Sequence, residues 1–343
     1  MALTASRIDD LKSVPSEFTF VHDSKSSSSD SIPTVDFSLL VSGNADQRSK
    51  TLLDLGKACE EWGFFVLINH GIPETLMKAV IDVSLEFFDL PEEEKRRYEA
   101  KSVSDPISAG TGITCNTSSN HKFLLWRDFV KSYLHPQFYC PEKPQRLRNI
   151  MSEYSEKIRW VLKKLLQGVS ENLNLEQESM DEALNLDSCS QLYAANLYPP
   201  CPQPDEAIGI PPHTDHGLLS FLIHNGVAGL QIQHNGDWFH TNSPENAILI
   251  NVGDQLEIFS NGRYKSVKHR AVVNTEATRI SVVLANGPAP DAVVSPSAEL
   301  VRRDGRGFYA PMKYKEFIET KLTNRYGEMG IMERLKINQD GRE

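Results

Sequence analysis

The triplet His213-Thr214-Asp215 places an imidazole and a carboxylate two positions apart in a β-rich part of the chain. In an extended segment such residues point to the same face, so both side chains can reach one common point. The chain has ten histidines, so a His-x-Asp triplet also arises by chance as a purely structural pair. A third ligand is therefore needed before the triplet predicts a metal site.

His269 provides that third ligand, in a run with strand character at residues 266–272. Two histidines and one carboxylate on a β-scaffold are typical of the facial triad of non-haem iron(II) oxygenases, which leaves coordination positions open. Catalytic zinc sites use the same ligand types. The three residues alone leave iron and zinc as alternatives.

Arg279 and Ser281 lie two positions apart on the next predicted strand, so a guanidinium and a hydroxyl converge on one face. Together they form a fork for a carboxylate. An arginine that points into a barrel is costly unless an anion meets it, which indicates a small dicarboxylate whose other end chelates the metal. Tyr198, at the end of an alternating segment, could place its hydroxyl against the same anion or could be an ordinary core residue.

The first half of the chain is predicted to be mostly helical. Apolar spacing favours helices at 45–61, 73–90 and 146–173, with a buried strand at 64–68 between the first two. The segment 103–119 is rich in Ser, Thr and Gly and is interpreted as a loop or an edge strand that borders a binding site.

After residue 187 short β-rich runs alternate with turn signals. Asn235-Gly236 and Asn261-Gly262 each predict a hairpin, the second between strands at 256–259 and 264–267. Further strands are expected at 247–252 and 279–285, and a helix at 313–325. This spacing indicates an antiparallel sandwich or barrel. We expect four parts: a flexible leader at 1–31, a mostly helical region at 32–186, a catalytic core at 187–290 and a C-terminal segment with a helix at 291–343.

Composition narrows the function classes. Of the 343 residues 40% are hydrophobic, which disfavours global disorder. The formal charge is −10, which disfavours nucleic acids and anionic membranes as partners. Five scattered cysteines indicate reduced thiols rather than a disulfide framework or a zinc cluster. The chain shows neither a signal peptide nor an apolar span, so we expect a soluble, cytoplasmic protein. We also expect a monomer.

The motifs together resemble the plant family of iron(II)- and 2-oxoglutarate-dependent dioxygenases, near its flavanone 3-hydroxylase-like and salicylate-hydroxylase-like members. The resemblance spans residues 32–317 and rests on these segments: Ile32-Pro33-Thr34-Val35-Asp36, Trp62-Gly63-Phe64-Phe65, Asn69-His70-Gly71, Asn196-Leu197-Tyr198-Pro199-Pro200-Cys201-Pro202, His213-Thr214-Asp215, Gly253-Asp254-Gln255-Leu256, Ser260-Asn261-Gly262 and Lys268-His269-Arg270.

The resemblance implies a distorted double-stranded β-helix (a cupin-like jelly roll) wrapped by helices. It also implies that His213, Asp215 and His269 hold Fe(II), and that 2-oxoglutarate is bound by Arg279, Ser281, Tyr198 and Asn196. The implied reaction uses O2, with ascorbate in support, to hydroxylate or desaturate a small, largely apolar plant metabolite (phenolic, flavonoid, terpenoid or hormone-like) with release of succinate and CO2. His70 and most other histidines are expected to be structural.

One position departs from the family pattern. Many relatives carry a long Arg, Lys or Met two residues before the Asn, where this chain has Ala194. We therefore expect a roomier pocket without a charge at that point, which disfavours an anionic substrate there. The candidate wall residues are Ile113, Phe123, Tyr133, His216, Leu218, Phe308 and Tyr309.

Two other functions fit part of the pattern. An enzyme that resembles aminocyclopropane-carboxylate oxidase would share the iron triad and the Arg-x-Ser pair but would not consume 2-oxoglutarate. A catalytically silent jelly roll would use the same barrel to hold a hormone-like ligand. Coupled succinate release separates both from the first interpretation. The substrate, the oxidised carbon and the type of product are not encoded in any motif of the chain.

Overall fold

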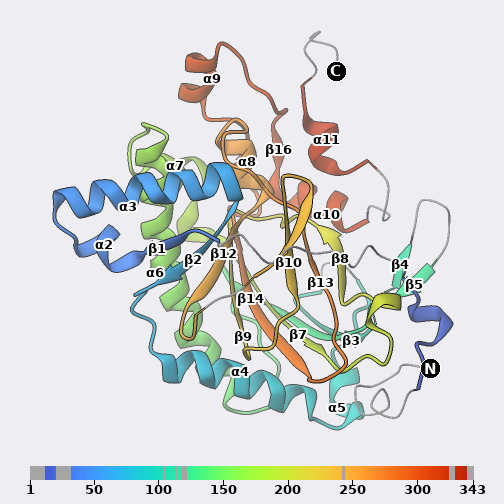
Figure 1. The fold of residues 1–343 in the computed structure, drawn as a ribbon. Coiled ribbons are helices and arrows are strands. Elements are labelled where there is room, and N and C mark those ends of the chain that lie inside the picture. The colour runs from blue at the N-terminus through green and yellow to red at the C-terminus, as the bar shows by residue number, and fades with distance from the viewer. Residues whose placement is uncertain are drawn as a thin grey trace.

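The computed structural model describes residues 12–20, 32–102, 105–112, 114–116, 122–241, 244–323 and 329–337. Two β-sheets form the centre of the molecule and helices surround them (Figure 1). The large sheet has eight strands in the order β1-β2-β12-β9-β14-β7-β6-β3, and the small sheet has four in the order β11-β10-β13-β8. Neighbouring strands pair antiparallel except β1 and β2, which are parallel.

The strands of the large sheet are β1 (Thr34–Asp36), β2 (Phe64–Ile68), β3 (Ile107–Thr111), β6 (Asp128–His135), β7 (Ser190–Tyr198), β9 (Leu219–His224), β12 (Ile248–Val252) and β14 (Arg279–Gly287). The small sheet contains β8 (Ile210–His213), β10 (Leu230–His234), β11 (Asp237–His240) and β13 (His269–Ala271). Two separate pairs are β4 (Thr114–Asn116) with β5 (Lys122–Leu124), and β15 (Val293–Val294) with β16 (Met312–Lys313).

The described helices are α2 (Phe37–Ser42), α3 (Ala45–Lys57), α4 (Glu74–Phe88), α5 (Glu92–Arg96), α6 (Leu147–Asn172), α7 (Ser179–Leu184), α8 (Asp254–Phe259), α9 (Ala298–Asp304), α10 (Tyr314–Thr323) and α11 (Ile331–Leu335). A π-helical turn, Ala58–Trp62, continues α3, and short 3-10 turns lie at Ser16–Phe18, Leu186–Ser188 and Pro204–Glu206. A capping box between Asn44 and Gln47 starts α3. Among the described helices, none is long and apolar enough to cross a membrane.

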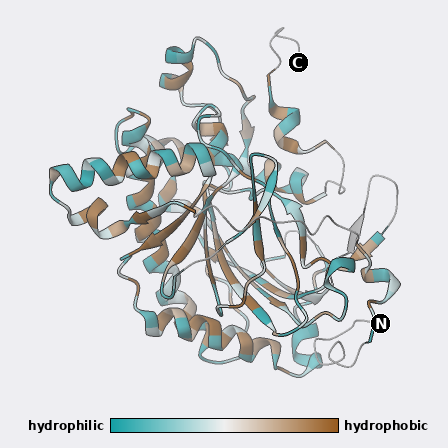
Figure 2. Ribbon diagram, viewed as in Figure 1, coloured by the Kyte–Doolittle hydropathy of each residue, from teal (hydrophilic) through white to brown (hydrophobic). Residues whose placement is uncertain are grey.

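The large sheet has two different faces. Its outer face packs against α4 and α6, in a core that includes Val130, Ala195 and Val282. Hydrophobic residues predominate in the central strands (Figure 2). Its inner face looks toward the small sheet, and Phe64 of β2 lies in one cluster with Ile232 of β10. Because strand side chains alternate between faces, the residues next to these outer ones, such as Asn196 and Ser281, point inward.

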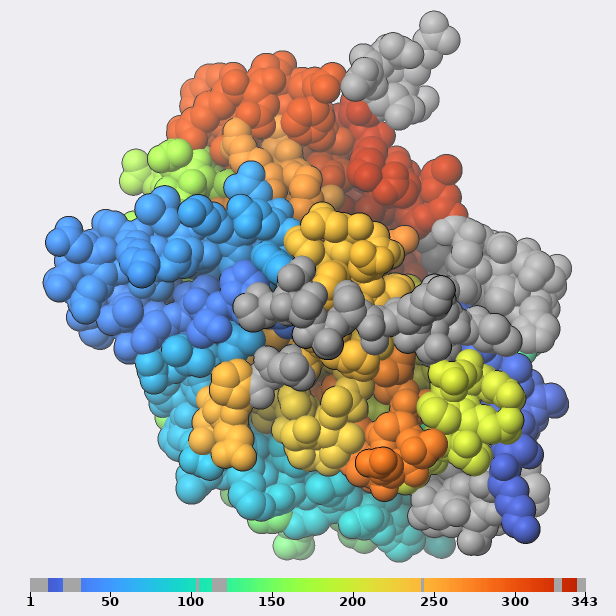
Figure 3. Space-filling view, in the orientation of Figure 1, coloured from blue at the N-terminus to red at the C-terminus, as the bar shows by residue number. Residues whose placement is uncertain are grey.

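The ends of the molecule are formed by different parts of the chain. In the space-filling view the C-terminal helices, coloured red, cover one end, and the α4–α5 region, coloured cyan, covers the opposite end (Figure 3). Lys321 of α10 contacts Thr214, the residue between His213 and Asp215. Its ammonium lies 2.8 Å from the Thr214 hydroxyl oxygen. The C-terminal segment therefore supports the interior of the β core.

Most of the predicted elements are confirmed. The helices expected at 45–61, 73–90 and 146–173 correspond to α3 with its π turn, α4 and α6, and the strand at 64–68 is β2. The Asn235-Gly236 hairpin joins β10 to β11, with φ of 51° and 93° at its two turn residues. Within segment 103–119, residues 107–111 form β3, which lies at the edge of the large sheet.

The prediction of a strand at 256–259 is wrong, because these residues belong to α8. Leu256, Ile258 and Phe259 have strand-forming side chains, but all three are buried on a short helix that starts after Gly253. Tertiary packing outweighs their β propensity here. Asn261-Gly262 adopts positive φ after this helix rather than closing a hairpin. The prediction of a strand at 264–267 is also wrong, because these residues connect α8 to β13, which begins only at His269. α9 is a further helix that the sequence pattern did not indicate.

Candidate metal centre

His213, Asp215 and His269 lie together between the two sheets. Their ligand atoms are all within 4.8 Å of one another. Oδ1 of Asp215 lies 3.7 Å from Nε2 of His213 and 3.5 Å from Nε2 of His269. The two histidines are direct neighbours because β8 and β13 pair with His213 opposite His269. Residues far apart in the sequence are thus brought to one point by strand pairing.

Backbone carbonyls orient both imidazoles. Nδ1 of His213 lies 2.9 Å from the Pro211 oxygen, and Nδ1 of His269 lies 3.2 Å from the Val267 oxygen. A carbonyl only accepts, so each Nδ1 must carry the proton and each Nε2 keeps its lone pair for a metal ion. Each carbonyl belongs to the residue two positions before its histidine, so the same local geometry is used twice.

The Asp215 carboxylate is held on its other oxygen. The Asn251 amide of β12 donates a hydrogen bond of 2.9 Å to Oδ2 of Asp215, which leaves Oδ1 facing the imidazoles. The Asp254 amide donates to the backbone oxygen of Asp215 at 2.8 Å. Lys321 in turn forms a hydrogen-bonded ion pair with Asp254 and also reaches Thr214. Such partners fix a ligand before the metal binds.

The protonation states suit a divalent cation. Burial and the neighbouring His269 lower the pKa of His213 to about 3, so this imidazole is neutral at pH 7. Burial alone would raise the pKa of Asp215, but His269 and His213 hold it well below its usual range. A neutral imidazole and an ionised carboxylate are the forms that ligate metals. The residues present therefore fit an iron ion, and zinc by the same donors.

Arg279 is buried inside the core. Its side chain starts on β14 opposite Tyr198 of β7, and its guanidinium carbon lies 5.1 Å from the Tyr198 ring centroid. Only 2% of Arg279 is exposed, and its Nε has no hydrogen-bond partner among the described residues. Burial lowers the pKa of Arg279, and Tyr198 opposes this shift. A buried cation with an unused donor fits a carboxylate ligand.

Two glycines make room for this pair. A Cβ at Gly229 would lie 2.7 Å from Cδ of Arg279, and a Cβ at Gly209 would lie 2.6 Å from the Tyr198 ring. No side chain is tolerated at such distances without a shift of Arg279 or Tyr198. Neither glycine stood out in the sequence, because their role depends on strands that are distant along the chain.

Arg279, Ser281 and Asn196 share the inner face of the large sheet with Asn251, which contacts Asp215 of the other layer. Ser281 pairs with Asn196, two positions along from the Arg279–Tyr198 pair. Further along the same face, β14 pairs with β9, and β9 pairs with β12, which carries Asn251. The Asn251 side chain donates a hydrogen bond to Asp215. The Asn196 side-chain oxygen accepts a hydrogen bond from Arg127, a residue that sequence reasoning missed. The arginine–serine pair and the histidine–aspartate cluster therefore open into one interior.

The candidate wall residues have varied surroundings. Tyr133 lies on the inner face of β6, and the imidazole of His216 bonds to the Tyr314 hydroxyl at 2.8 Å. Leu218 is fully buried in the main core, and Phe123 packs on Phe20 with ring centroids 4.8 Å apart.

The C-terminal candidates are partly engaged elsewhere. Phe308 is half-buried against the main core, where its amide bonds to Asn261. The Tyr309 hydroxyl donates to Glu257 at 2.6 Å. Ile113 lies outside the described residues. His70 has the expected structural role, since its ring nitrogens contact the Asn246 oxygen and the Ile72 amide.

The position at Ala194 differs from the expectation of an uncharged site. Lys131 of β6 lies directly opposite Ala194 of β7, so the neighbouring strand brings a cation to the same place. The neighbouring strand therefore supplies a positive charge that the prediction from Ala194 did not include. The signal that could have revealed Lys131 is the alternation of Phe129, Lys131 and Tyr133, but the segment was not recognised as a strand.

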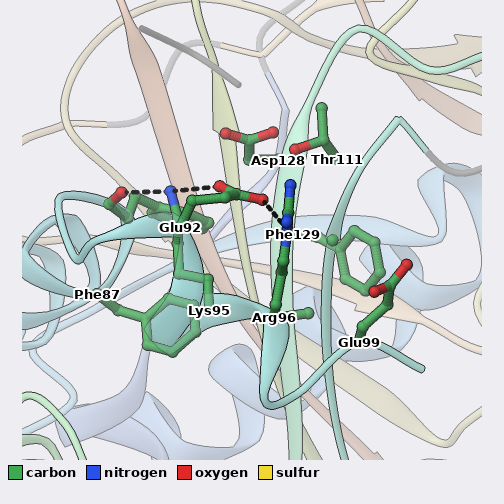
Figure 4. A pocket seen from close by; sticks show the side chains of 11 residues that line it. Phe87, Glu92, Lys95, Arg96, Glu99, Thr111, Asp128 and Phe129 are labelled. Atoms are coloured by element: carbon green, nitrogen blue, oxygen red, sulfur yellow. Dashed lines mark hydrogen bonds and ion pairs between the residues drawn. The ribbon is translucent and has the colours of Figure 1, made fainter. Parts of the chain in front are cut away.

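A cavity of about 360 Å³ lies away from the histidine cluster, between α4–α5 and strands β3 and β6 (Figure 4). Lys95 and Arg96 in its wall are 3.7 Å and 3.5 Å from the carboxylate of Glu92. Both cations thus pair with Glu92, and none of the three metal-ligand candidates lines the cavity. Phe129 is the wall residue that also borders the interior.

Two histidines and a carboxylate on the inner wall of a double-layered β core define the architecture of non-haem iron(II) oxygenases. Comparison with known families agrees. Residues 187–288 match the 2OG-Fe(II) oxygenase superfamily, and residues 32–153 match the N-terminal region of non-haem dioxygenases in morphine synthesis.

Individual relatives extend this match over nearly the whole chain. A 2-oxoglutarate-dependent dioxygenase 19 of Oryza sativa subsp. japonica is 43% identical over 92% of this chain and 93% of its own length. A flavonol synthase/flavanone 3-hydroxylase of Eustoma exaltatum subsp. russellianum is 34% identical over 85% and 86%. A crystal structure of JOX2 in complex with 2OG, Fe and JA superposes with a TM-score of 0.82 at 27% identity, covering 96% and 95%.

The chain therefore belongs to the plant 2-oxoglutarate- and iron(II)-dependent dioxygenases. It is an oxidoreductase that uses Fe(II), 2-oxoglutarate and O2, and the expected jelly-roll core with helical flanks is confirmed.

Proposed function

We propose that His213, Asp215 and His269 hold the iron of this dioxygenase and that Arg279 binds the distal carboxylate of 2-oxoglutarate. The observation that carries the proposal is the buried guanidinium of Arg279. Its Nε lacks a hydrogen-bond partner in the described chain. Arg279 lies on the inner face of the large sheet, on the side of the histidine–aspartate cluster. A dicarboxylate spans the two groups by chelating the metal at one end and pairing with Arg279 at the other.

Ser281, Tyr198 and Asn196 complete the proposed 2-oxoglutarate subsite. Ser281 offers a hydroxyl on the same face as Arg279, and Tyr198 packs its ring on the guanidinium. Asn196 is held by Arg127. When bound, iron and 2-oxoglutarate supply the oxidising chemistry that removes hydrogen from a C–H bond. The residues of the chain bind and orient both groups and keep water from the interior.

The substrate that we propose is a small plant metabolite with a largely apolar body: phenolic, flavonoid, terpenoid or hormone-like. Support comes from the relatives, among which a flavonol synthase/flavanone 3-hydroxylase is 34% identical. The inner wall near the cluster offers Phe129, Tyr133 and Val283 as apolar contacts. Tyr133 and His216 are wall candidates for this substrate. The proposed product is an alcohol or an alkene.

A metabolite screen tests this function. Purified protein with Fe(II), ascorbate and 2-oxoglutarate is expected to release succinate in proportion to substrate oxidised. An enzyme that resembles aminocyclopropane-carboxylate oxidase would oxidise its substrate without succinate, and a silent binding protein would give neither product. Arg279→Ala should abolish succinate release at low 2-oxoglutarate, and His234→Ala serves as a control because His234 stacks on Trp62 away from the cluster.

We further propose a cytoplasmic monomer that acts in specialised metabolism and has neither nucleic-acid nor membrane partners. Four cysteines of the described chain, Cys59, Cys140, Cys189 and Cys201, are free and buried thiols, which suits a reducing compartment. The charge of −10 opposes binding to polyanions. Light scattering during size-exclusion chromatography tests the monomer, and a dimer mass would contradict it.

A further inference from the structure

Lys131 stands on the inner wall of the β core. It lies on β6 opposite Ala194 of β7, and Ala194 lies opposite Val283 of β14. Directly opposed residues in a sheet have Cβ atoms about 5 Å apart, so Lys131 begins next to the small side chain of Ala194, and Val283 lies one strand further. In the adjacent row Phe129 lies opposite Asn196, which belongs to the proposed 2-oxoglutarate subsite.

The ammonium group of Lys131 has an aromatic ring as its neighbour. It lies 5.6 Å from the centroid of the Phe129 ring, and no hydrogen bond or ion pair joins it to any residue in the described ranges. The lysine is half-buried. A cation in such a place is stabilised when an anion binds beside it.

The ammonium is within electrostatic reach of the metal centre. The Asp215 carboxylate favours the charged form of Lys131. Burial and the charge of Arg127 lower the pKa of Lys131 to about 8, so the group is still largely protonated at pH 7. A ligand next to the metal therefore meets a positive charge on this wall.

We infer that Lys131 is a substrate-binding residue and that the substrate carries a carboxylate, which pairs with the ammonium while the apolar body lies toward the metal. This inference rests on the proposed function of the same site. It specifies the carboxylate as the polar group that the substrate must carry. It also places the residue that selects this group, Lys131, on β6 rather than at position 194 of β7.

The charge balance of the loaded site supports an anionic substrate. Divalent iron, the Asp215 carboxylate, the 2-oxoglutarate dianion and the Arg279 guanidinium sum to zero. Lys131 then adds a positive charge that no hydrogen bond or ion pair in the described ranges offsets. A substrate carboxylate offsets this surplus, whereas a neutral substrate leaves it in a poorly hydrated interior.

Matched acids and amides test the inference. The full chain, loaded anaerobically with Fe(II) and 2-oxoglutarate, is titrated calorimetrically with cinnamate and 2-naphthoate and with the neutral primary amide of each. Four proteins are compared: wild type, Lys131→Met, Lys131→Arg and Lys78→Met. Lys78 is a suitable control because it is an exposed lysine of α4 that pairs with Asp82. The visible band of the iron–2-oxoglutarate chelate is recorded for every protein.

The expected result is that wild type and Lys78→Met bind the acids at least ~30-fold more tightly than the amides. Lys131→Met should lose this preference, and Lys131→Arg should keep most of it. Three outcomes overturn the inference: no preference for the acids in wild type, including no binding of either form; a preference that survives in Lys131→Met; or a loss of 2-oxoglutarate affinity in Lys131→Met as large as that for the acids. A wild type without the chelate band would instead show that the proposed function has failed, and the inference with it.

Discussion

Asn251 donates a hydrogen bond of 2.9 Å to Oδ2 of Asp215, the carboxylate oxygen that faces away from the two imidazoles. Asn251 lies on β12 of the large sheet and is 5% exposed, whereas Asp215 follows β8 of the small sheet. The contact therefore joins the two layers at the metal-ligand cluster. The bond to Oδ2 also fixes the rotation of the carboxylate, so that Oδ1 faces His213 and His269.

Asn251→Ala should weaken metal binding without removing a ligand. Loss of a partner that orients a ligand typically lowers metal affinity by about 10–100-fold. Titration of the apo protein with Co(II), followed by its visible absorption, measures this directly. Asn225→Ala, which removes a loop amide bonded to the Thr278 backbone, is the matched control and should change the affinity little. Equal affinities in Asn251→Ala and wild type would show that the hydrogen bond does not position Asp215.

Arg279→Ala should weaken 2-oxoglutarate binding by about 2–5 kcal/mol, because the carboxylate loses a buried charge-assisted partner. Arg279→Lys should restore part of the affinity, since it keeps the charge but not the fork. Anaerobic titration of the iron-loaded protein with 2-oxoglutarate provides the dissociation constants. An unchanged constant in Arg279→Ala would remove this residue from the site.

Gly229→Ala should weaken 2-oxoglutarate binding indirectly, by displacing Arg279. The added Cβ would lie 2.7 Å from Cδ of Arg279 and 2.9 Å from the Val272 oxygen, so the guanidinium has to move. We expect a rise of about tenfold or more in KM for 2-oxoglutarate, since a displaced fork loses its hydrogen-bond geometry. Gly330→Ala is the control, because a Cβ there meets nothing within 4 Å. A KM equal to that of the control variant would mean that Arg279 accommodates the methyl group.

Lys321→Met should destabilise the fold. Lys321 pairs with Asp254, whose side chain is fully buried, and it also donates to Thr214 at 2.8 Å. A buried carboxylate that loses its cation costs about 3–5 kcal/mol. Urea unfolding measures the free energy of unfolding of Lys321→Met and of Lys321→Met/Asp254→Asn, which should recover much of the loss. If Lys321→Met is as stable as wild type, the ion pair does not hold α10 against the metal-ligand turn.

Local patterns in the sequence were sufficient for the residues that act in pairs. Alternation placed His213 with Asp215, and Arg279 with Ser281, on common faces, and it needed no knowledge of neighbouring strands. The helix α6 and the strand β2 followed from their apolar spacing in the same way. These features are encoded within a few consecutive residues.

Features that depend on strand pairing could not be predicted. Lys131 lies near the proposed site only because β6 pairs with β7 at Ala194. A glycine is needed at position 229 only because the Arg279 side chain passes close to it. The error at 256–259 has a related cause, because burial of Ile258 and Phe259 on α8 is decided by the surrounding core rather than by their own β propensity. The resemblance to the family identified the iron and 2-oxoglutarate candidates, but it did not reveal the cation on the opposite strand.

The most direct test of the assigned centre is the visible charge-transfer band that forms when 2-oxoglutarate is added to the Fe(II)-loaded protein without oxygen. We expect the band in wild type and in His234→Ala. It should be absent or strongly reduced in His213→Ala and Asp215→Ala, which each lack a ligand of the cluster. A wild type without a band, or a band that is unchanged in both ligand variants, would contradict the assignment of His213, Asp215 and His269 as the iron site.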